Sequence, residues 1–329
     1  MRRGVVAAGI AAVLALVAYG GASALIYRKL TKVTGQCPPS WLANSPTSFS
    51  LLAFDGGPVD GHEQFDTTPY FMPEPEAVRF PSRDPGMEVS GWYLPAADPA
   101  APTVVVVHGL TACKRDHAVL LPAGMLHREG FAVLLIDLRN HGDSSFKGGR
   151  YAGGTEEYRD VLSAWDWLQR AKGAPANRIG LLGISLGAAT VLIATGHEPG
   201  VAATWADSSY ADLQSAIGDE LSREGYPGFL APGGMLAARL LGGDDLTSYS
   251  PLDGVHDLGG RPVFLTHGDR DDRVSVRYAS VLADRIRADG GRVETWIVPG
   301  AGHTEAMLLH PDEYERRLVG FFRAELGDE

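Results

Sequence analysis

A single serine follows an apolar run in the stretch RIGLLGISLGAATVLIA, residues 178–194. A glycine lies two residues to either side of it, and an alanine-rich segment of helical composition follows at once. The sequence predicts a tight strand-to-helix turn with Ser185 at its tip, where Gly183 and Gly187 permit close backbone contacts. A hydroxyl raised above the carboxyl end of a sheet in this way is a candidate nucleophile. The alternative is a small residue at a crowded turn, without a chemical role.

A serine hydroxyl needs a base to accept its proton, and the base needs a carboxylate to orient it. We predict that His303 is the base, because it follows the last expected strand and a flexible Gly-Ala-Gly in VPGAGHTEAM. Asp271, in LTHGDRDDRV, follows the preceding strand, so the chain order is Ser, Asp, His. From spacing alone Asp271 leads only slightly over the other acids at strand ends, Asp207, Asp269 and Asp272.

An oxyanion that develops on an acyl group needs backbone donors. The N–H of Leu186, at the start of the helix after Ser185, is one candidate. The N–H of Leu110 is the other, in the loop after the first core strand, VVVVHGLTACKRD. His108 and His267 lie at the ends of expected strands, and we expect both to bind loop carbonyls in a structural role. Asp137 is expected to shape its own turn.

The segments around these residues predict an α/β fold. Residues 77–80 and 87–94 flank Asp84-Pro85-Gly86 and are typical of a hairpin. Apolar strands then alternate with helices near 155–170, 186–196, 276–289 and 311–325, which indicates a mostly parallel, doubly wound sheet. The long connection at about 208–255 predicts a small helical cap. Its apolar side chains are expected to line a pocket or to pack the cap on the body, namely Phe229, Leu230, Met235 and Leu236.

The N-terminus is different in kind. Residues 5–26 carry no charge and would span roughly 33 Å as a helix, enough to cross a bilayer. Basic residues flank the run on both sides, so its orientation is left open. We favour an uncleaved anchor over residues 1–35, although Ala22-Ser23-Ala24 also fits a signal-peptide cleavage site. Residues 36–75 are proline-rich and predict an irregular lead-in, and residues 76–329 the catalytic domain. Because every candidate site residue lies downstream, we expect a protein without residues 1–35 to be soluble and fully active on small, water-soluble esters.

Composition excludes some functions. The net charge of −11 argues against nucleic-acid binding, and no phosphate-binding glycine motif is present. Cys37 and Cys113 are the two cysteines, too few for a zinc cluster. A single disulfide between them is the alternative, but we expect both to be free thiols.

Six motifs in order, HGLT, DLRNHGDS, GISLGAAT, ADSSYADL, HGDRDDRV and GAGHTEAM, resemble the α/β-hydrolase superfamily. The chain is most similar there to bacterial, membrane-anchored serine hydrolases of the monoacylglycerol-lipase-like type, from about residue 75 to the end. The resemblance implies that Asp271 is the acid, by the pattern H-G-x-x-D-x-x-V. Ser275 replaces the proline that usually follows Val274. The resemblance also implies hydrolysis of an ester, thioester or amide without cofactor or metal.

These patterns predict a serine esterase with Ser185, Asp271 and His303 as its triad, acting on a small acyl substrate. A peptidase or thioesterase of the same fold is the alternative, although the second glycine that many such peptidases carry after the turn is replaced by Ala188. A binding protein that has lost its chemistry is the alternative from another class.

Overall fold

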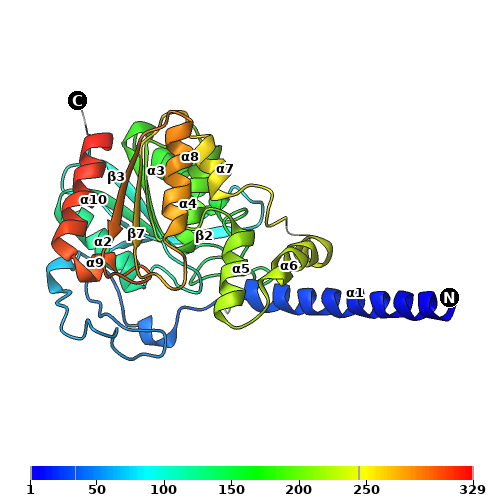
Figure 1. Cartoon of the computed structure of the whole chain (residues 1–329). Helices are drawn as coiled ribbons and strands as arrows, with labels where there is room; N and C mark the ends of the chain where they lie inside the picture. The colour runs from blue at the N-terminus through cyan, green and yellow to red at the C-terminus, as the bar shows by residue number, and fades with distance from the viewer. Residues whose placement is uncertain (1, 34, 244, 328–329) are drawn as a thin grey trace.

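An eight-stranded sheet forms the centre of the protein, in the strand order β1-β2-β4-β3-β5-β6-β7-β8 (Figure 1). The computed structural model describes residues 2–33, 35–243 and 245–327. The strands are β1 (Glu76–Pro81), β2 (Glu88–Leu94), β3 (Thr103–Val107), β4 (Ala132–Ile136), β5 (Ile179–Ile184), β6 (Ala203–Asp207), β7 (Val263–Gly268) and β8 (Val293–Val298). β1 and β2 form the predicted antiparallel hairpin, β2 pairs antiparallel with β4, and the other neighbours are parallel.

Helices cover both faces of the sheet. One face carries α2 (His117–Arg128), α9 (Ala306–Leu309) and α10 (Pro311–Leu326), and α10 packs on α2. The other face carries α3 (Tyr158–Lys172), α4 (Leu186–His197), α7 (Pro251–His256) and α8 (Arg277–Ala288), which contact one another in that order. This is the α/β-hydrolase fold that the sequence predicts.

The central elements are apolar on every side because both faces of the sheet are covered. β3 is almost entirely valine, a residue whose branched side chain favours strands, and all its residues are buried. α4 is buried from Leu186 to Thr195, in contrast to α8, which is amphipathic and exposes its charged residues. Short 3₁₀ turns occur at Pro39–Trp41, Thr68–Tyr70, Ala176–Arg178 and Gly228–Leu230.

The cap lies between β6 and β7, over the carboxyl ends of the strands. It contains α5 (Leu213–Arg223), α6 (Ala231–Ala237) and a π-helical turn at Ala238–Gly242. Met235 is buried and Leu230 lines a groove, whereas Phe229 and Leu236 are exposed. Of the four apolar residues named from the sequence, Leu230 therefore lines a hollow as expected, the groove between the cap and α1.

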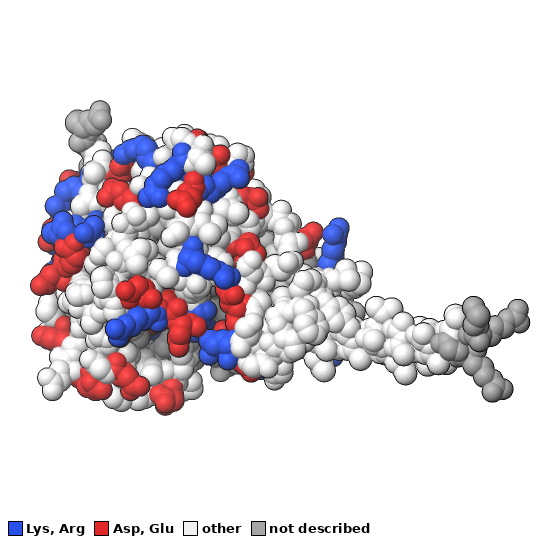
Figure 2. All heavy atoms as spheres, viewed as in Figure 1, with Lys and Arg blue, Asp and Glu red and all other residues white. Residues whose placement is uncertain are grey.

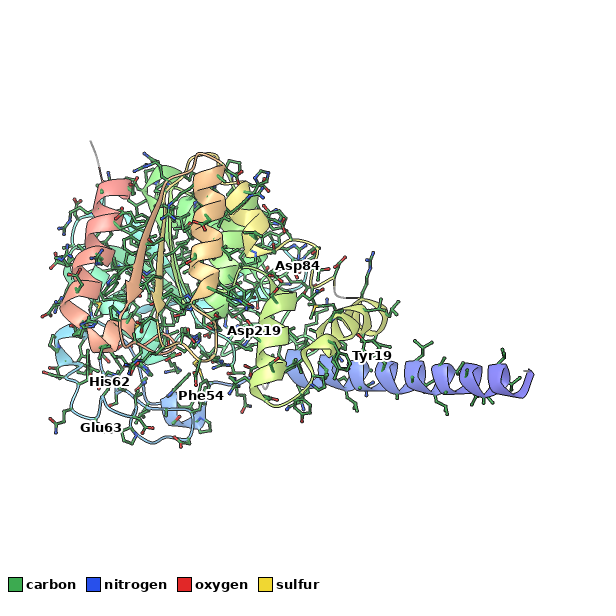
Figure 3. The ribbon with its side chains drawn as sticks, viewed as in Figure 1. Tyr19, Phe54, His62, Glu63, Asp84 and Asp219 are labelled. Atoms are coloured by element: carbon green, nitrogen blue, oxygen red, sulfur yellow. A yellow bond between two sulfur atoms is a disulfide. The ribbon has the colours of Figure 1, made fainter. Side chains whose placement is uncertain are left out.

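The long N-terminal helix α1 (Arg2–Thr31) protrudes from the body, with its last turns against the cap (Figure 1). Side chains from residue 5 to residue 18 are exposed, but Ser23, Ile26 and Tyr27 are buried. Tyr19 donates a hydrogen bond to the carbonyl of Phe229 at 3.1 Å, where α1 meets the cap (Figure 3). The end of α1 is thus part of the folded domain, a contact that the anchor boundary at residue 35 did not anticipate.

The lead-in also packs on the domain. Phe49, Leu51, Tyr70 and Met72 belong to the apolar core on the α2 and α10 side of the sheet. These aromatic and aliphatic side chains are scattered among the prolines without helical or strand periodicity. The sequence pattern therefore did not predict their burial.

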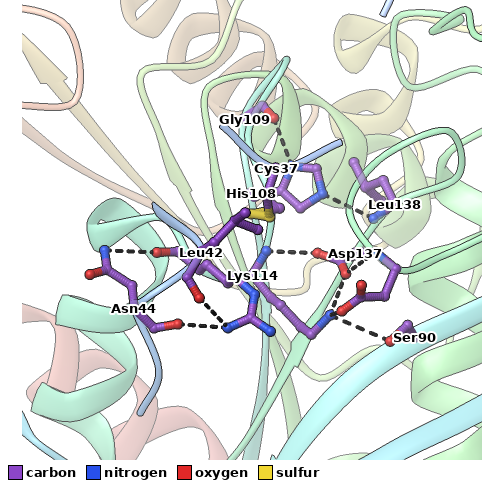
Figure 4. Close-up of a disulfide and its surroundings, with 12 residues drawn as sticks. Cys37, Leu42, Asn44, Ser90, His108, Gly109, Lys114, Asp137 and Leu138 are labelled. Carbon is purple, nitrogen blue, oxygen red and sulfur yellow. Dashed lines mark hydrogen bonds and ion pairs between the residues drawn. A yellow bond between two sulfur atoms is a disulfide. The ribbon is translucent and has the colours of Figure 1, made fainter. Parts of the chain in front are cut away.

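Cys37 and Cys113 form a disulfide, so the expectation of free thiols is wrong. Their Cα atoms lie 5.6 Å apart, within the usual range for a bridge, although 76 residues separate them in sequence. The bridge ties the lead-in to the loop after β3 (Figure 4). Beside it, Lys114 forms a buried ion pair with Asp137 at 2.5 Å. Asp137 also accepts hydrogen bonds from the N–H groups of Lys114 and Asp143, so it shapes its own turn as predicted.

Candidate active site

Ser185 occupies the turn between β5 and α4, with backbone angles φ 56° and ψ −116°. A positive φ is uncommon for a residue other than glycine and marks a turn whose geometry is imposed by its surroundings. A Cβ at Gly183 would collide with the carbonyl of Gly187, and a Cβ at Gly187 with that of Val107. The two glycines therefore allow the turn to sit tightly on β3, and the hydroxyl of Ser185 points above the sheet.

The structure brings Ser185, His303 and Asp271 together. His303 Nε2 lies 2.9 Å from Ser185 Oγ, and His303 Nδ1 lies 2.7 Å from Asp271 Oδ2. The other carboxylate oxygen of Asp271 accepts hydrogen bonds from the N–H groups of Arg273 and Val274. Burial alone would raise the pKa of Asp271, but hydrogen bonds from His267 and His303 hold that pKa well below its usual range. The carboxylate is thus ionised and fixed beside the imidazole.

The other candidate acids have different partners. Asp207 is fully buried and accepts hydrogen bonds from Tyr314 and Ser208, each at 2.9 Å. Burial raises the pKa of Asp207 to about 6, against the opposing effect of those two hydrogen bonds. Asp269 is exposed and accepts a bond from the N–H of Gly300, and Asp272 is exposed. Among these four acids, Asp271 is the one whose carboxylate is hydrogen-bonded to His303.

The histidines at strand ends bind loop carbonyls as predicted. His267 Nε2 lies 2.7 Å from the carbonyl oxygen of Val274 and 3.2 Å from Asp271 Oδ2. His108 lies with Nδ1 2.7 Å from the carbonyl of Gly109, and its Nε2 accepts the N–H of Leu138. Burial lowers the pKa of His108 to about 3, so its ring is neutral.

The loop that carries His303 is held by residues that the sequence did not single out. Glu305 accepts the N–H of Gly302, and it pairs at 2.8 Å with His62 of the lead-in (Figure 3). Ser208 accepts the N–H of Thr304 at 3.2 Å. His62 is separated from the loop by most of the chain, so neither spacing nor local pattern could have identified this contact.

The two candidate oxyanion donors lie beside Ser185. Leu110 and Leu186 line the same hollow as Ser185, and Leu186 is the first residue of α4, whose N–H is free of an intrahelical partner. Thr111, in the same loop after β3 as Leu110, adopts a positive φ of 60°. The disulfide at Cys113 fixes the far end of that loop.

A small, mostly apolar pocket opens at Ser185. Its walls come from the end of α1, the loop after β3, the cap helix α5 and the loop after β7; they include Leu30, Leu110, Tyr151, Leu213, Ile217, Glu220 and Arg273. Its volume is about 120 Å³. A serine hydroxyl that is hydrogen-bonded to an imidazole, which is in turn hydrogen-bonded to a carboxylate, at the mouth of an apolar pocket, is an arrangement suited to attack on an acyl carbonyl.

Comparison with known proteins shows the family of the chain. Residues 121–329, more than half of the chain, match the prolyl oligopeptidase family. The chain belongs to that family. It is a serine hydrolase of the α/β-hydrolase fold, of esterase or peptidase type.

Several relatives of this prolyl oligopeptidase family member have been described. An uncharacterized protein of Salmonella typhi, YfhR, is 26% identical over 274 residues, which is 77% of this chain and 83% of that protein. An uncharacterized peptidase of Bacillus subtilis, YuxL, is 25% identical over 74% of this chain but 37% of its own length.

Solved structures share the fold. An esterase from Pyrococcus furiosus superposes with a TM-score of 0.64 at 22% identity, covering 85% of this chain and all of its own. An acylaminoacyl peptidase from Pyrococcus horikoshii superposes with a TM-score of 0.58 at 19% identity, covering 77% of this chain and 42% of its own.

Proposed function

We propose that this family member hydrolyses carboxylic esters, with Ser185 as nucleophile, His303 as general base and acid, and Asp271 as the residue that orients His303. The observation that carries the proposal is the unbroken series of hydrogen bonds from Ser185 Oγ through the imidazole to Asp271. The apolar pocket beside Ser185 favours an acyl group without charge.

In the first half of the reaction, His303 Nε2 takes the proton of Ser185 as the hydroxyl oxygen attacks the acyl carbon. The carbonyl oxygen becomes negative and is bound by the N–H groups of Leu110 and Leu186, each worth roughly 3 kcal/mol of barrier. The carboxylate of Asp271 stabilises the imidazolium. That imidazolium then gives its proton to the leaving alkoxide, and an acyl-enzyme remains.

In the second half, His303 removes a proton from water, and the hydroxide attacks the acyl-enzyme through the same oxyanion site. The bond to Ser185 Oγ breaks, the serine recovers its proton from His303, and a carboxylic acid leaves. The steps consume one water and need no cofactor.

Covalent labelling tests the proposal. A fluorophosphonate reacts with an activated serine, so the full chain should be labelled at Ser185, and Ser185→Ala should not. Hydrolysis should be measured on p-nitrophenyl esters, a thioester and an aminoacyl p-nitroanilide. Absence of labelling and of ester turnover in folded protein would refute the proposal.

A peptidase is the second candidate, because the family match and the name of the Bacillus subtilis relative both point that way. The aminoacyl anilide separates the two. An amide-to-ester ratio of kcat/KM above one would favour the peptidase, since an ester is the more reactive substrate and its faster cleavage needs no special recognition of the amine.

We further propose that α1 is an uncleaved membrane anchor. Among the residues that the structure describes, one helical stretch, Val5–Thr31, is long and apolar enough to cross a bilayer. Cleavage after Ala24 would cut a helix that continues to Thr31 and is buried at Ile26 and Tyr27. Mass spectrometry of the purified protein's N-terminus distinguishes the anchor, with residues 1–24 present, from a signal peptide.

The disulfide supports one orientation of the anchor, which the flanking charges leave open. Bridges persist in oxidising compartments, so the pairing of Cys37 with Cys113 favours a catalytic domain on the exported side of the membrane. Protease added to spheroplasts should digest the domain, and thiol alkylation should require prior reduction. Protection of the domain together with free thiols would reverse the orientation.

A further inference from the structure

Two apolar hollows meet at one residue of the anchor helix. The pocket at Ser185 includes Leu30 in its wall, and so does a separate groove between α1 and the cap. The groove is lined by Ala22, Leu25, Ile26, Lys29, Leu30, Leu221, Glu224, Tyr226 and Leu230. On the cap side, Glu220 lines the pocket and Leu221 lines the groove, so the two hollows are also neighbours along α5.

The two volumes suggest that the hollows serve one ligand. The pocket at Ser185 holds about 120 Å³, below the ~300–1,000 Å³ of usual small-molecule sites. The groove adds about 360 Å³ and brings the total into that range. A short acyl group would fill the pocket alone, whereas a long one would have to pass Leu30 into the groove.

The groove is apolar where a hydrocarbon chain would lie. Its two charged residues neutralise each other, since Lys29 Nζ lies 2.6 Å from Glu224. The half-exposed ring of Tyr226 lies against the same ammonium group, at 5.0 Å from its centroid. An aromatic ring and a lysine side by side are typical of the boundary between lipid and water.

The length of the exposed part of α1 brings this groove to the bilayer. Residues 5–18 extend free of the domain and would span only about 21 Å, less than the ~30 Å apolar thickness of a membrane. The turns from Tyr19 to Ile26, which pack on the cap, must therefore lie in the lipid as well. Apolar side chains on the adjoining cap face are exposed, namely Phe229, Leu236, Leu240 and Leu241. In Figure 2 the protruding described part of α1 shows no charged side chain, whereas the body carries many. On the cap, the exposed Arg239 lies among these leucines in sequence and 3.8 Å from Asp245.

We propose that the groove between α1 and α5 receives the long acyl chain of a membrane lipid ester, which reaches Ser185 sideways from the bilayer. The inference rests on the esterase function proposed above and adds a substrate class to it. The anchor helix is then a wall of the substrate site as well as a tether. Hydrolysis at Ser185 follows the steps already given, with the fatty acyl group in the groove and the polar leaving group toward the water.

The test measures acyl-chain preference in the full chain reconstituted in phosphatidylcholine vesicles. The readout is the ratio of kcat/KM for a dodecanoyl ester to that for a butanoyl ester, because partition of each ester into the vesicle is then common to all variants. Ala22→Phe fills the groove and is expected to lower this ratio about tenfold, the loss of burial of roughly two methylene groups. Ala24→Phe is the matched control on the other side of the helix, outside the groove, and should leave the ratio unchanged.

A second variant guards against a folding defect. Leu25 lines the groove but is 69% exposed, so Leu25→Gln removes apolar surface without opening the core. It should also lower the ratio, and labelling with a short-chain fluorophosphonate at the wild-type rate shows that the site is intact in each variant.

The possible outcomes distinguish failure of the acyl groove from failure of the proposed esterase function. Lowered ratios in Ala22→Phe and Leu25→Gln, with normal Ser185 labelling, support the acyl groove. An unchanged ratio in both, or a wild-type protein that cleaves butanoyl but not dodecanoyl esters, overturns the groove and leaves the esterase proposal standing. A wild-type protein with no labelling and no ester turnover would contradict both the acyl groove and the esterase function.

Discussion

The carboxylate of Asp271 holds the imidazole of His303 from the loop after β7, with 2.7 Å between Oδ2 and Nδ1. Asp207 is the last residue of the neighbouring strand β6, and its carboxylate is bound to Tyr314 and Ser208 instead. Two acids at the same edge of the sheet therefore have different hydrogen-bond partners, and mutation should reveal the difference in their roles.

Asp271→Asn is expected to lower kcat by about 10⁴ at neutral pH, because the amide keeps the shape but favours the wrong tautomer of His303 and removes the charge. Asp269→Asn and Asp272→Asn are matched controls on the same loop and should stay within about tenfold, since exposed charges act through screened fields. The measurement is kcat on one ester. A crippled Asp207→Asn or Asp269→Asn beside an active Asp271→Asn would show that the acid is misassigned.

Ser185→Ala should reduce kcat by on the order of 10⁶, as expected when the members of a triad act as a unit. Folding should be retained, because alanine has a Cβ like serine and meets the same positive φ of 56°. Thermal unfolding and ester turnover are measured on the same sample. Turnover near the wild-type rate would contradict the assignment of Ser185.

Asp207 should make stability depend on pH. Its pKa is raised to about 6 by burial, above the ~3.9 of an unfolded chain, so its stabilising contribution is complete below pH 4 and is lost as the pH rises through 6. The shift corresponds to roughly 3 kcal/mol. Asp207→Asn does not titrate, so its free energy of unfolding relative to wild type should rise between pH 4.5 and pH 8. A difference independent of pH would contradict the raised pKa.

Removing the disulfide with Cys37→Ser and Cys113→Ser should destabilise the protein by about 2–5 kcal/mol, because the bridge closes a long loop in the unfolded chain. It should also lower kcat more than it raises KM, since Cys113 fixes the loop that carries the Leu110 donor. Chemical denaturation and ester kinetics check the two effects. Equal stability with and without the bridge would remove its structural role.

The mostly parallel sheet was predictable because its central strands, β3 to β7, are buried on both faces and leave unbroken apolar runs. Ser185 and His303 were predictable for a related reason, since both lie at turns that follow such runs and carry glycines nearby. Asp271 was less predictable, because it is one of three aspartates in the same loop. Which of the three binds the imidazole depends on the folded conformation of that loop.

Contacts between distant segments could not be predicted. The pairing of Cys37 with Cys113 depends on where an irregular lead-in runs over the surface, and two cysteines carry no spacing pattern. His62 reaches Glu305 by the same route. The packing of the end of α1 on the cap could not be predicted, because a segment that crosses a membrane and a helix end that packs on protein have the same apolar composition.

Truncation separates the free and the packed parts of α1. Deleting residues 1–18 removes the turns whose described side chains, from residue 5 onward, are exposed, so the shortened protein should stay folded, lose the membrane span and keep kcat near that of the full chain on a butanoyl ester. Deleting residues 1–35 also removes the buried side chains of Ile26, Tyr27 and Val33, which should cost about 3 kcal/mol or more of stability. Leu30 is lost from the pocket wall in the same deletion, so butanoyl turnover should fall as well. The test is to measure the free energy of unfolding and the kcat on a butanoyl ester for both deletion proteins under the same conditions. If the longer deletion is as stable and as active as the shorter one, the domain begins after residue 35, as the sequence alone indicates, and the packed turns of α1 contribute nothing to it.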